Sequence, residues 1–365
     1  MKPIILEINL KNIVHNFNIL RKFYKKSKIA AVVKANAYGL GIERVSKILI
    51  KNKCKDFFVA TLEEGLELRK INKNIKIYIL NGISKNEVNL FYKNNLIPVI
   101  NNINEYKILL KTNKYYQVAL HYDTGMNRLG LNYKEILYIN KRIGRSMMKL
   151  TYIISHLVSA ENYSDKYNTN QLKKINKLKS IIKDKKISLA NSAGVFLGKE
   201  FKYDMIRPGI SLYGGYGNNK IKKYIKNVIK LKAKIIQIKK INKNDTVGYN
   251  HTFKAKKNMY IATLAIGYAD GISRKLSNKG FAYYKNNKAK FLGNVSMDSI
   301  VIDVSNFYKN IKVGNYVELI NEKNDIEKMA KLVDTVSQEI LTSFGKRVNL
   351  KYIKWFWTRS KIFIR

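Results

Sequence analysis

A single pattern recurs eight times over about the first two thirds of the chain: a short apolar run followed by a segment with helical spacing of apolar residues. Runs of this length match buried strands, and apolar residues three and four positions apart are typical of amphipathic helices. Eight strands alternating with helices predict an α/β fold with a parallel TIM-type (β/α)8 barrel. The expected strands cover 28–35, 56–61, 75–80, 96–101, 116–122, 150–156, 187–191 and 204–210. The leading segment 6–26 would add an initial strand and helix.

The pattern changes after about residue 225, where β-rich runs are separated by turn residues. Their apolar-polar alternation favours antiparallel pairing. We therefore predict two domains, a barrel over 1–225 and a mostly β domain over 226–365.

Composition narrows the class of protein. Hydrophobic residues make up 46% of the chain, which is enough for a buried core, and the one cysteine, Cys54, excludes an internal disulfide. Cys54 has no redox or metal pattern around it, so we expect a structural or surface thiol. The first 17 residues lack the features of a signal peptide, and no run of 18 apolar residues occurs. The expectation is a cytoplasmic protein without a membrane span.

The formal net charge of +45 raises the question of nucleic-acid binding. The basic residues are mostly lysines spread over the whole chain, and arginine, which reads bases and grips phosphates, is scarce. No basic stripe with interleaved aromatic residues is visible. The charge is therefore interpreted as solvated surface, although it should concentrate anionic ligands near the protein.

Several polar residues stand where the expected barrel strands end, which is where barrel enzymes place their catalytic groups. Among them, Lys34 ends the first strand. Burial lowers the pKa of a lysine amine, and a neutral amine can form a Schiff base with a carbonyl compound. A lysine whose ammonium reaches solvent is the alternative interpretation. The other members of this set are Asp123, Arg128, His156, Asn191, Ser192 and Arg207.

The segment VVKANAYGLG around Lys34 closely resembles the cofactor-lysine motif of alanine racemases. Further similar segments follow in the same order over nearly the whole chain, and the ordered set is specific to that family. They are HYDTGMNRLG, SHLVSAE, LANSAG, IRPGISLYGG, VGYNHTF, GYADG, GNVSMD and EILTSFGKRV.

The resemblance implies that Lys34 holds pyridoxal 5'-phosphate as a Schiff base and is one of two acid/base groups. Tyr38 and Ser192 would bind the cofactor phosphate, together with the backbone N–H groups of Gly209 and Ile210. Arg207 would donate a hydrogen bond to the pyridine nitrogen and keep it unprotonated, because an arginine does not readily lose a proton.

The resemblance also implies a homodimer with shared active sites. Tyr249 would enter from the other subunit as the second base and interconvert L- and D-alanine together with Lys34, with D-alanine supplied for peptidoglycan. His156 would hydrogen-bond that tyrosine at the cofactor. Arg128 and the backbone of Met297 would bind the substrate carboxylate, and Tyr268 would narrow the entrance to the site.

Three positions depart from the family pattern. His121 stands where many members carry a carbamylated lysine that supports the arginine matching Arg128. Gln338 replaces a tyrosine that contacts the phosphate, and Ser188 replaces a histidine that supports the arginine matching Arg207. None of these changes removes a proton-transfer group.

Other functions fit parts of the sequence. A serine or broad-specificity amino-acid racemase could use the same scaffold. A cofactor-carrier protein would share the barrel, but that class normally lacks the second domain and Tyr249. A nucleic-acid-binding protein would need clustered basic residues, which are missing. We expect a small-molecule substrate and no metal.

Overall fold

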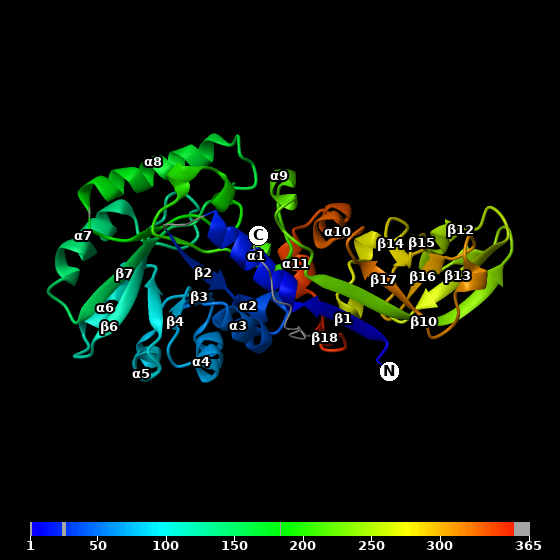
Figure 1. Ribbon diagram of the computed structural model, residues 1–365, viewed down its shortest axis with the longest axis horizontal. Helices are drawn as coiled ribbons and strands as arrows, with labels where there is room; N and C mark the ends of the chain where they lie inside the picture. Colours follow the sequence, from blue (N-terminus) through cyan, green and yellow to red (C-terminus); the bar gives the residue numbers. More distant parts are fainter. Residues whose placement is uncertain (1, 24–26, 183, 354–365) are drawn as a thin grey trace, which may run out of the picture. The chain divides into compact units, whose positions relative to one another are not determined.

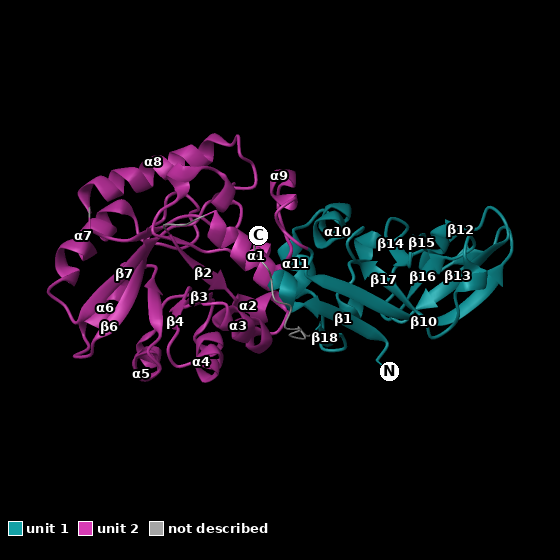
Figure 2. Cartoon of the chain, viewed as in Figure 1, with its two compact units in different colours: residues 1–13, 227–365 teal, residues 14–226 magenta. Residues whose placement is uncertain are grey.

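The computed structural model describes residues 2–23, 27–182 and 184–353, and the chain divides into two compact units (Figures 1 and 2). Unit 1 comprises Met1–Ile13 and Asn227–Arg365, and unit 2 comprises Val14–Lys226. Residues 354–365 of the expected second domain, and 24–26 of the expected first helix, lie outside the described residues.

Unit 2 is a nearly closed barrel of eight parallel strands in the order β8-β7-β6-β5-β4-β3-β2-β9. The two end strands are linked by backbone hydrogen bonds from Asp204 to Ile187 (2.9 Å) and from Arg207 to Ala190 (3.0 Å). Every strand overlaps one predicted run, so the predicted barrel is confirmed. The strands are β2 (Lys28–Val32), β3 (Asp56–Val59), β4 (Lys76–Ile79), β5 (Ile97–Ile100), β6 (Tyr116–His121), β7 (Met148–Ile154), β8 (Ile187–Ser188) and β9 (Met205–Ile206).

The helices between these strands bury one apolar stripe each, as the spacing predicts. In α3 (Ile42–Lys51), for example, Ile42, Val45 and Leu49 are buried while the intervening charged residues face solvent. The other helices are α1 (Leu10–Lys22), α4 (Leu62–Ile71), α5 (Val88–Lys93), α6 (Ile103–Leu110), α7 (Tyr133–Ile143), α8 (Lys166–Ile181) and α9 (Asn219–Lys222). The segment labelled α2 (Lys34–Tyr38) has left-handed backbone angles from Ala35 on and is not a regular helix.

Unit 1 is built on one sheet in the order β13-β16-β15-β14-β17-β10-β1-β18, in which β10 also pairs with β13. The pairings are antiparallel, as predicted, except that β1 and β18 are parallel. The strands are β1 (Ile4–Asn9), β10 (Ile229–Ile241), β13 (Met259–Leu264), β14 (Phe281–Tyr284), β15 (Asn287–Leu292), β16 (Ile300–Asp303), β17 (Tyr316–Ile320) and β18 (Asn349–Ile353). A short pair, β11 (Thr246–Val247) and β12 (Phe253–Lys254), and two helices, α10 (Ile326–Leu332) and α11 (Ser337–Thr342), complete the unit.

The first strand lies in a different unit from the one we expected. The sequence predicts a strand there, but β1 pairs with β10 and β18 in unit 1 instead of preceding the barrel. The side chain of Glu7, in the middle of β1, pairs with Lys232 at 2.7 Å and with Lys351 at 3.4 Å. Alternation predicts a strand but not its partners, because strand pairing depends on residues far along the chain.

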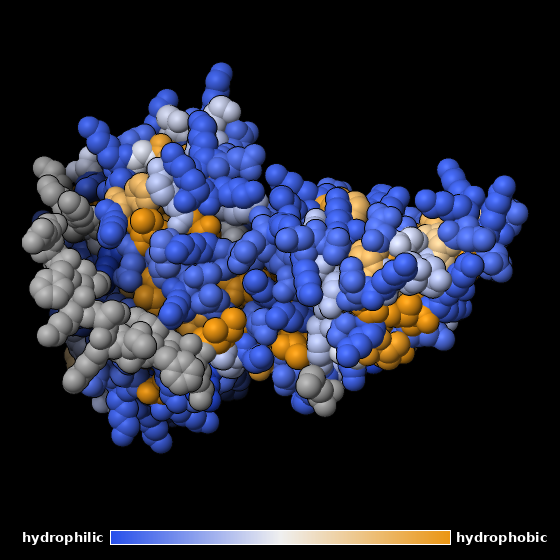
Figure 3. All heavy atoms as spheres, turned by 45° about the vertical axis from the view of Figure 1, so that its right-hand side comes forward, coloured by the Kyte–Doolittle hydropathy of each residue, from blue (hydrophilic) through white to orange (hydrophobic). Residues whose placement is uncertain are grey.

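The face in Figure 3 is mostly hydrophilic, with scattered hydrophobic patches, as expected for charge spread over solvated surface. Among the described helices, none has the length and apolarity needed to span a membrane. Cys54 is buried, and burial raises the pKa of its thiol to about 12, which fits a structural thiol.

Two loops of unit 1 meet at Gly267. The backbone N–H groups of Tyr268 and Ala269 donate to the carbonyl oxygens of Ser296 (3.0 Å) and Met297 (3.1 Å). A Cβ atom at Gly267 would lie 2.3 Å from both of those oxygens. The close approach of the loops that carry Tyr268 and Met297 therefore requires glycine.

We predict that Gly267→Ala lowers the free energy of unfolding by about 1–3 kcal/mol, because backbone atoms must shift to admit the methyl group. Gly144→Ala is the matched control, since its Cβ would meet no atom within 4 Å. Its free energy of unfolding should change by less than about 1 kcal/mol, in either direction. Urea denaturation measures both, and equal effects would contradict the close contact at Gly267.

Candidate functional site

The backbone that leads to Lys34 is fixed from three directions. Val32 donates its N–H to the carbonyl oxygen of Pro208 (3.0 Å), and Val33 donates to that of Phe58 (2.9 Å). The hydroxyl of Tyr213 donates to the carbonyl oxygen of Val32 (2.8 Å). Lys34 therefore begins at a defined point on the carboxyl-end rim of the barrel.

The chain then makes a left-handed turn. Residues 35–38 have φ values of 52° to 56°, and the predicted strand 28–35 therefore ends at Val32. Such a conformation costs roughly 1–2 kcal/mol for each residue other than glycine. Hydrogen bonds from Ala37 to the Val33 carbonyl and from Gly39 to the Ala35 carbonyl, both 2.8 Å, oppose that cost. Strain of this kind is concentrated at functional sites.

Glu64 supports this turn, although we did not expect it from the sequence. One carboxylate oxygen accepts the N–H of Ala35, and the other accepts that of Ala60 at 2.7 Å. Glu64 also forms a capping box with Thr61 at the start of α4. The spacing of a threonine and a glutamate three residues apart is a recognisable signal for such a cap, but not for the contact with Ala35.

The surroundings of Lys34 favour its neutral form. Burial lowers the pKa of its amine, the charge of Arg128 lowers it further, and the charge of Glu64 acts in the opposite direction. A lysine with a lowered pKa is a better nucleophile toward a carbonyl at neutral pH.

Arg207 is a buried cation held by neutral acceptors. Its guanidinium donates to the carbonyl oxygen of Ser188 at 2.9 Å, to the hydroxyl of Ser188, and to the carbonyl oxygen of Ser155. Burial lowers the pKa of Arg207 only to about 10, so it stays charged at neutral pH. Ser188 thus supports the arginine at the position where the sequence departs from the family pattern.

Ser192 and Gly209 lie together next to Tyr38. The hydroxyl oxygen of Ser192 accepts the N–H groups of Gly209 (3.0 Å) and Ser211 (3.3 Å). A Cβ at Gly209 would lie 2.4 Å from the Tyr38 hydroxyl oxygen. Burial raises the pKa of Tyr38 to about 12, so its hydroxyl remains a donor. The predicted Ile210 begins the short helical turn Ile210–Tyr213 beside them.

This group fits a phosphate. It offers two hydroxyls and the backbone N–H of Ile210 at the start of a helical turn, an arrangement that commonly binds anions. The N–H of Gly209, which donates to Ser192, would be shared with the phosphate oxygens. The hydroxyl oxygen of Ser211 is buried and has no hydrogen-bond partner among the described residues. Arg207 and Lys34 add the other donors that a phosphorylated pyridine aldehyde would need.

Two histidines near this rim are held neutral. Burial, followed by the charges of Arg207 and Arg128, lowers the pKa of His156 to about 3. Burial and the charge of Arg207 lower the pKa of His121 to about 4. The Nδ1 atom of His121 lies 2.8 Å from the side-chain oxygen of Asn101. Because the Asn101 amide nitrogen donates to two carbonyl groups, its oxygen accepts and Nδ1 of His121 carries the proton.

Arg128 is exposed on a loop that is anchored to the end of β6. Leu131 donates its N–H to the carbonyl oxygen of His121 at 2.7 Å. The carboxylate of Asp123 accepts the N–H groups of Gly125 (2.8 Å) and Asn127 (3.1 Å). These hydrogen bonds fix the backbone from which the side chain of Arg128 extends.

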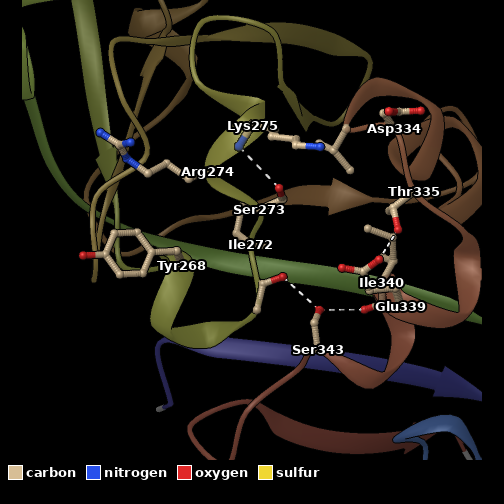
Figure 4. Close-up of a pocket in the computed structure, with 12 residues that line it drawn as sticks. Tyr268, Ile272, Ser273, Arg274, Lys275, Asp334, Thr335, Glu339, Ile340 and Ser343 are labelled. Atoms are coloured by element: carbon tan, nitrogen blue, oxygen red, sulfur yellow. Dashed lines mark hydrogen bonds between the residues drawn. The ribbon is translucent and has the colours of Figure 1, made fainter.

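The remaining predicted residues lie in unit 1. Tyr249, Tyr268 and Met297 are exposed there by 70%, 43% and 53%. Tyr268 borders a pocket of about 390 Å³, and its ring points away from Glu339 and Ser343 (Figure 4). Gln338 lies on α11.

Asp298, the residue after Met297, ties the loop of Met297 to the rest of unit 1. The guanidinium of Arg347 bridges the carboxylates of Asp270 and Asp298 at 2.7 Å each. Asn294, in the same loop, donates its amide to the carbonyl oxygen of Tyr249 at 2.9 Å.

Matches to known proteins extend over nearly the whole chain. Residues 8–217 match the family model "Alanine racemase, N-terminal domain", and residues 228–352 match "Alanine racemase, C-terminal domain". The chain is 39% identical to an alanine racemase of Rickettsia africae, over 95% of this chain and 98% of that one.

Solved structures agree with these matches. The structure of an alanine racemase from Bartonella henselae with covalently bound pyridoxal phosphate has a TM-score of 0.91 and 36% identity, covering 97% of this chain and all of that one. The structure of alanine racemase from Acinetobacter baumannii has the same TM-score at 29% identity, with the same coverage. The predicted resemblance is confirmed, and the chain belongs to the alanine racemase family.

Proposed function

We propose that this protein is a pyridoxal-phosphate-dependent racemase that interconverts L- and D-alanine, and that its D-alanine is used for peptidoglycan. The observation that carries the proposal is the position of Lys34. It is a lysine of lowered pKa directly before a strained turn, in the same barrel rim as Arg207 and the donors around Ser192. The name of the Rickettsia relative and the covalent cofactor of the Bartonella structure support it.

The residues of unit 2 divide the work of holding the cofactor. The Nζ atom of Lys34 would make the covalent bond. The hydroxyls of Tyr38 and Ser192, with the N–H groups of Gly209 and Ile210, would bind the phosphate. When bound, pyridoxal phosphate withdraws electrons from the amino-acid Cα and makes its hydrogen acidic.

Arg207 would determine how strongly the bound cofactor withdraws electrons from Cα. Its pKa of about 10 keeps the guanidinium protonated, so it donates a hydrogen bond to a pyridine nitrogen without giving up a proton. An unprotonated nitrogen attracts electrons more weakly. Fast return of the proton to Cα is then favoured over side reactions.

Inversion at one carbon needs two proton-transfer groups on opposite faces. We assign Lys34 to one face and Tyr249 to the other. We infer that Tyr249 and Met297 serve the partner subunit of a homodimer, since large side chains exposed by 70% and 53% fit a surface that a second subunit covers. The neutral His156 would accept a hydrogen bond from Tyr249 or donate one to it.

The substrate carboxylate would be bound by Arg128 and by the backbone N–H of Met297. Tyr268 would narrow the entrance and favour a small side chain such as that of alanine.

Purified protein should be yellow, with the visible absorbance of a Schiff base. Borohydride should bleach this colour and leave a phosphopyridoxyl group on Lys34, because the imine is reduced to a stable amine. Mass spectrometry of the peptide that contains residue 34 identifies the site. A protein that takes up no cofactor, or carries it on another lysine, would contradict the proposal.

Tyr249→Phe should reduce racemisation by about 100-fold or more, because it removes one positioned acid/base group. The colour should remain, since Lys34 is untouched. In deuterated water the variant should still exchange the α-hydrogen of D-alanine, whose proton faces Lys34 by family resemblance, but not that of L-alanine.

Tyr115→Phe is the matched control, since Tyr115 is an exposed tyrosine just before β6, at the opposite end of that strand from the rim that carries the assigned residues, and the change should leave the rate unchanged. Equal residual exchange of both enantiomers in Tyr249→Phe would mean that one base serves both faces.

Mixing inactive Lys34→Ala protein with Tyr249→Phe protein should restore activity. If sites are shared, each heterodimer contains one site with both native bases. Activity is measured after subunits have exchanged, as followed with two differently tagged chains. If heterodimers form without regaining activity, Tyr249 acts within its own subunit.

A further inference from the structure

Unit 2 contains a pocket of about 440 Å³ that the racemase reaction does not use. This volume is typical of sites for small molecules. None of the residues assigned above to cofactor or substrate lines it. Its lining residues are Phe23, Tyr163, Val195, Phe196, Gly198, Lys202, Asn219, Lys220, Lys223 and Tyr224.

One wall of the pocket is a cluster of three aromatic rings. Phe23 makes edge-to-face contacts with Phe196 and with Tyr224, each with ring centroids 5.0 Å apart. Phe196 and Tyr224 are nearly parallel, with an interplanar angle of 18° and centroids 5.9 Å apart. All three rings are half-buried, so part of each remains open to a ligand. Such a wall suits a flat aromatic group.

The charged residues of the pocket are all cationic. Lys220 lies over the ring of Tyr163 at 5.4 Å, and Lys223 lies over that of Tyr224 at 5.1 Å. The ammonium of Lys202 donates to the carbonyl oxygen of Phe23 at 3.0 Å. Among the described lining residues none is an aspartate or a glutamate. Two carboxylates lie next to the lining, Glu161 near Tyr163 and Glu200 against Gly198. The three lysines outnumber them, so the net local charge favours an anion.

The hydroxyl of Tyr163 supplies an independent indication. Its oxygen is buried and has no hydrogen-bond partner in the described part of the chain. Burial, and then the charge of Glu161, raise the pKa of Tyr163 to about 12, so this group remains an O–H donor. A buried donor without an acceptor costs about 1–3 kcal/mol, and a bound anion would supply the acceptor.

We propose that this pocket binds a small anion that carries an aromatic ring, of about the size of a mononucleotide. The ring would pack against Phe196 and Tyr224. The anionic group would accept hydrogen bonds from Lys220, Lys223 and the Tyr163 hydroxyl. The shared chemistry is one ring and one phosphate or carboxylate.

Isothermal titration calorimetry of the purified protein at about 0.15 M salt tests this directly. The probes are adenosine 5'-monophosphate and 4-hydroxybenzoate, compared with adenosine and inorganic phosphate. At least one of the first two should bind at one site and at least about tenfold more tightly than adenosine or phosphate, which each lack one half of the chemistry. Whichever of the two probes binds more tightly shows whether the pocket prefers a phosphate or a carboxylate. If neither adenosine 5'-monophosphate nor 4-hydroxybenzoate binds more tightly than adenosine and phosphate do, the proposal is wrong.

Variants locate the site and separate it from general attraction to a chain of charge +45. Tyr163→Phe should weaken binding by about tenfold, the size of one hydrogen bond, and Lys220→Gln/Lys223→Gln by about 100-fold. The matched control is Lys134→Gln/Lys141→Gln on α7, which removes two exposed lysines elsewhere.

The control should change binding by less than about threefold. Equal weakening by both double variants would show diffuse attraction and overturn the proposal. Circular dichroism verifies folding. The lysine variants alter exposed side chains, so they still give an answer if Tyr163→Phe does not fold. Because Lys34 and Tyr38 are unchanged throughout, the result does not depend on whether the protein is a racemase.

Discussion

The clamp on the end of β2 is the constraint on which the rest of the site depends. Val32 and Val33 are bonded to Pro208 on one side and Phe58 on the other, so the backbone cannot shift without breaking the barrel. This fixed end directly precedes four consecutive residues in the left-handed region, whose strain must be offset by surrounding contacts. Glu64, in the first turn of α4, then accepts the N–H of the first of them, Ala35. The position of Lys34 is thus set by sheet pairing rather than by its own side chain.

Burial and the charge of Arg207 together keep the two neighbouring histidines neutral. Arg207 is bonded to serine oxygens rather than to a carboxylate, so its charge is not neutralised by its hydrogen-bond partners. That charge adds to burial in lowering the pKa values of His156 and His121. Both imidazoles are neutral at physiological pH as a result. Each can then accept a hydrogen bond at one nitrogen and donate one at the other.

The sequence predicted the features that periodicity and ordered motifs control. All eight barrel strands and the antiparallel β unit are present, and the family is confirmed. What it could not predict depends on non-local pairing or on backbone conformation. The strand at Ile4–Asn9 has an ordinary alternating pattern that does not specify β10 as its neighbour. The turn at 35–38 contains no glycine, and Glu64 is recognisable only as a cap.

The division of the predicted residues between two units has a chemical rationale in the proposed reaction. In that reaction, Lys34 and the phosphate donors would hold the cofactor at the barrel rim, and Lys34 would serve one face of Cα. A proton on the opposite face of Cα would need a donor from another direction. Tyr249 lies in the β unit, on a loop held by Asn294, and is exposed by 70%. A proton-transfer group carried on a separate unit would serve the second face of Cα while the barrel strands keep their positions.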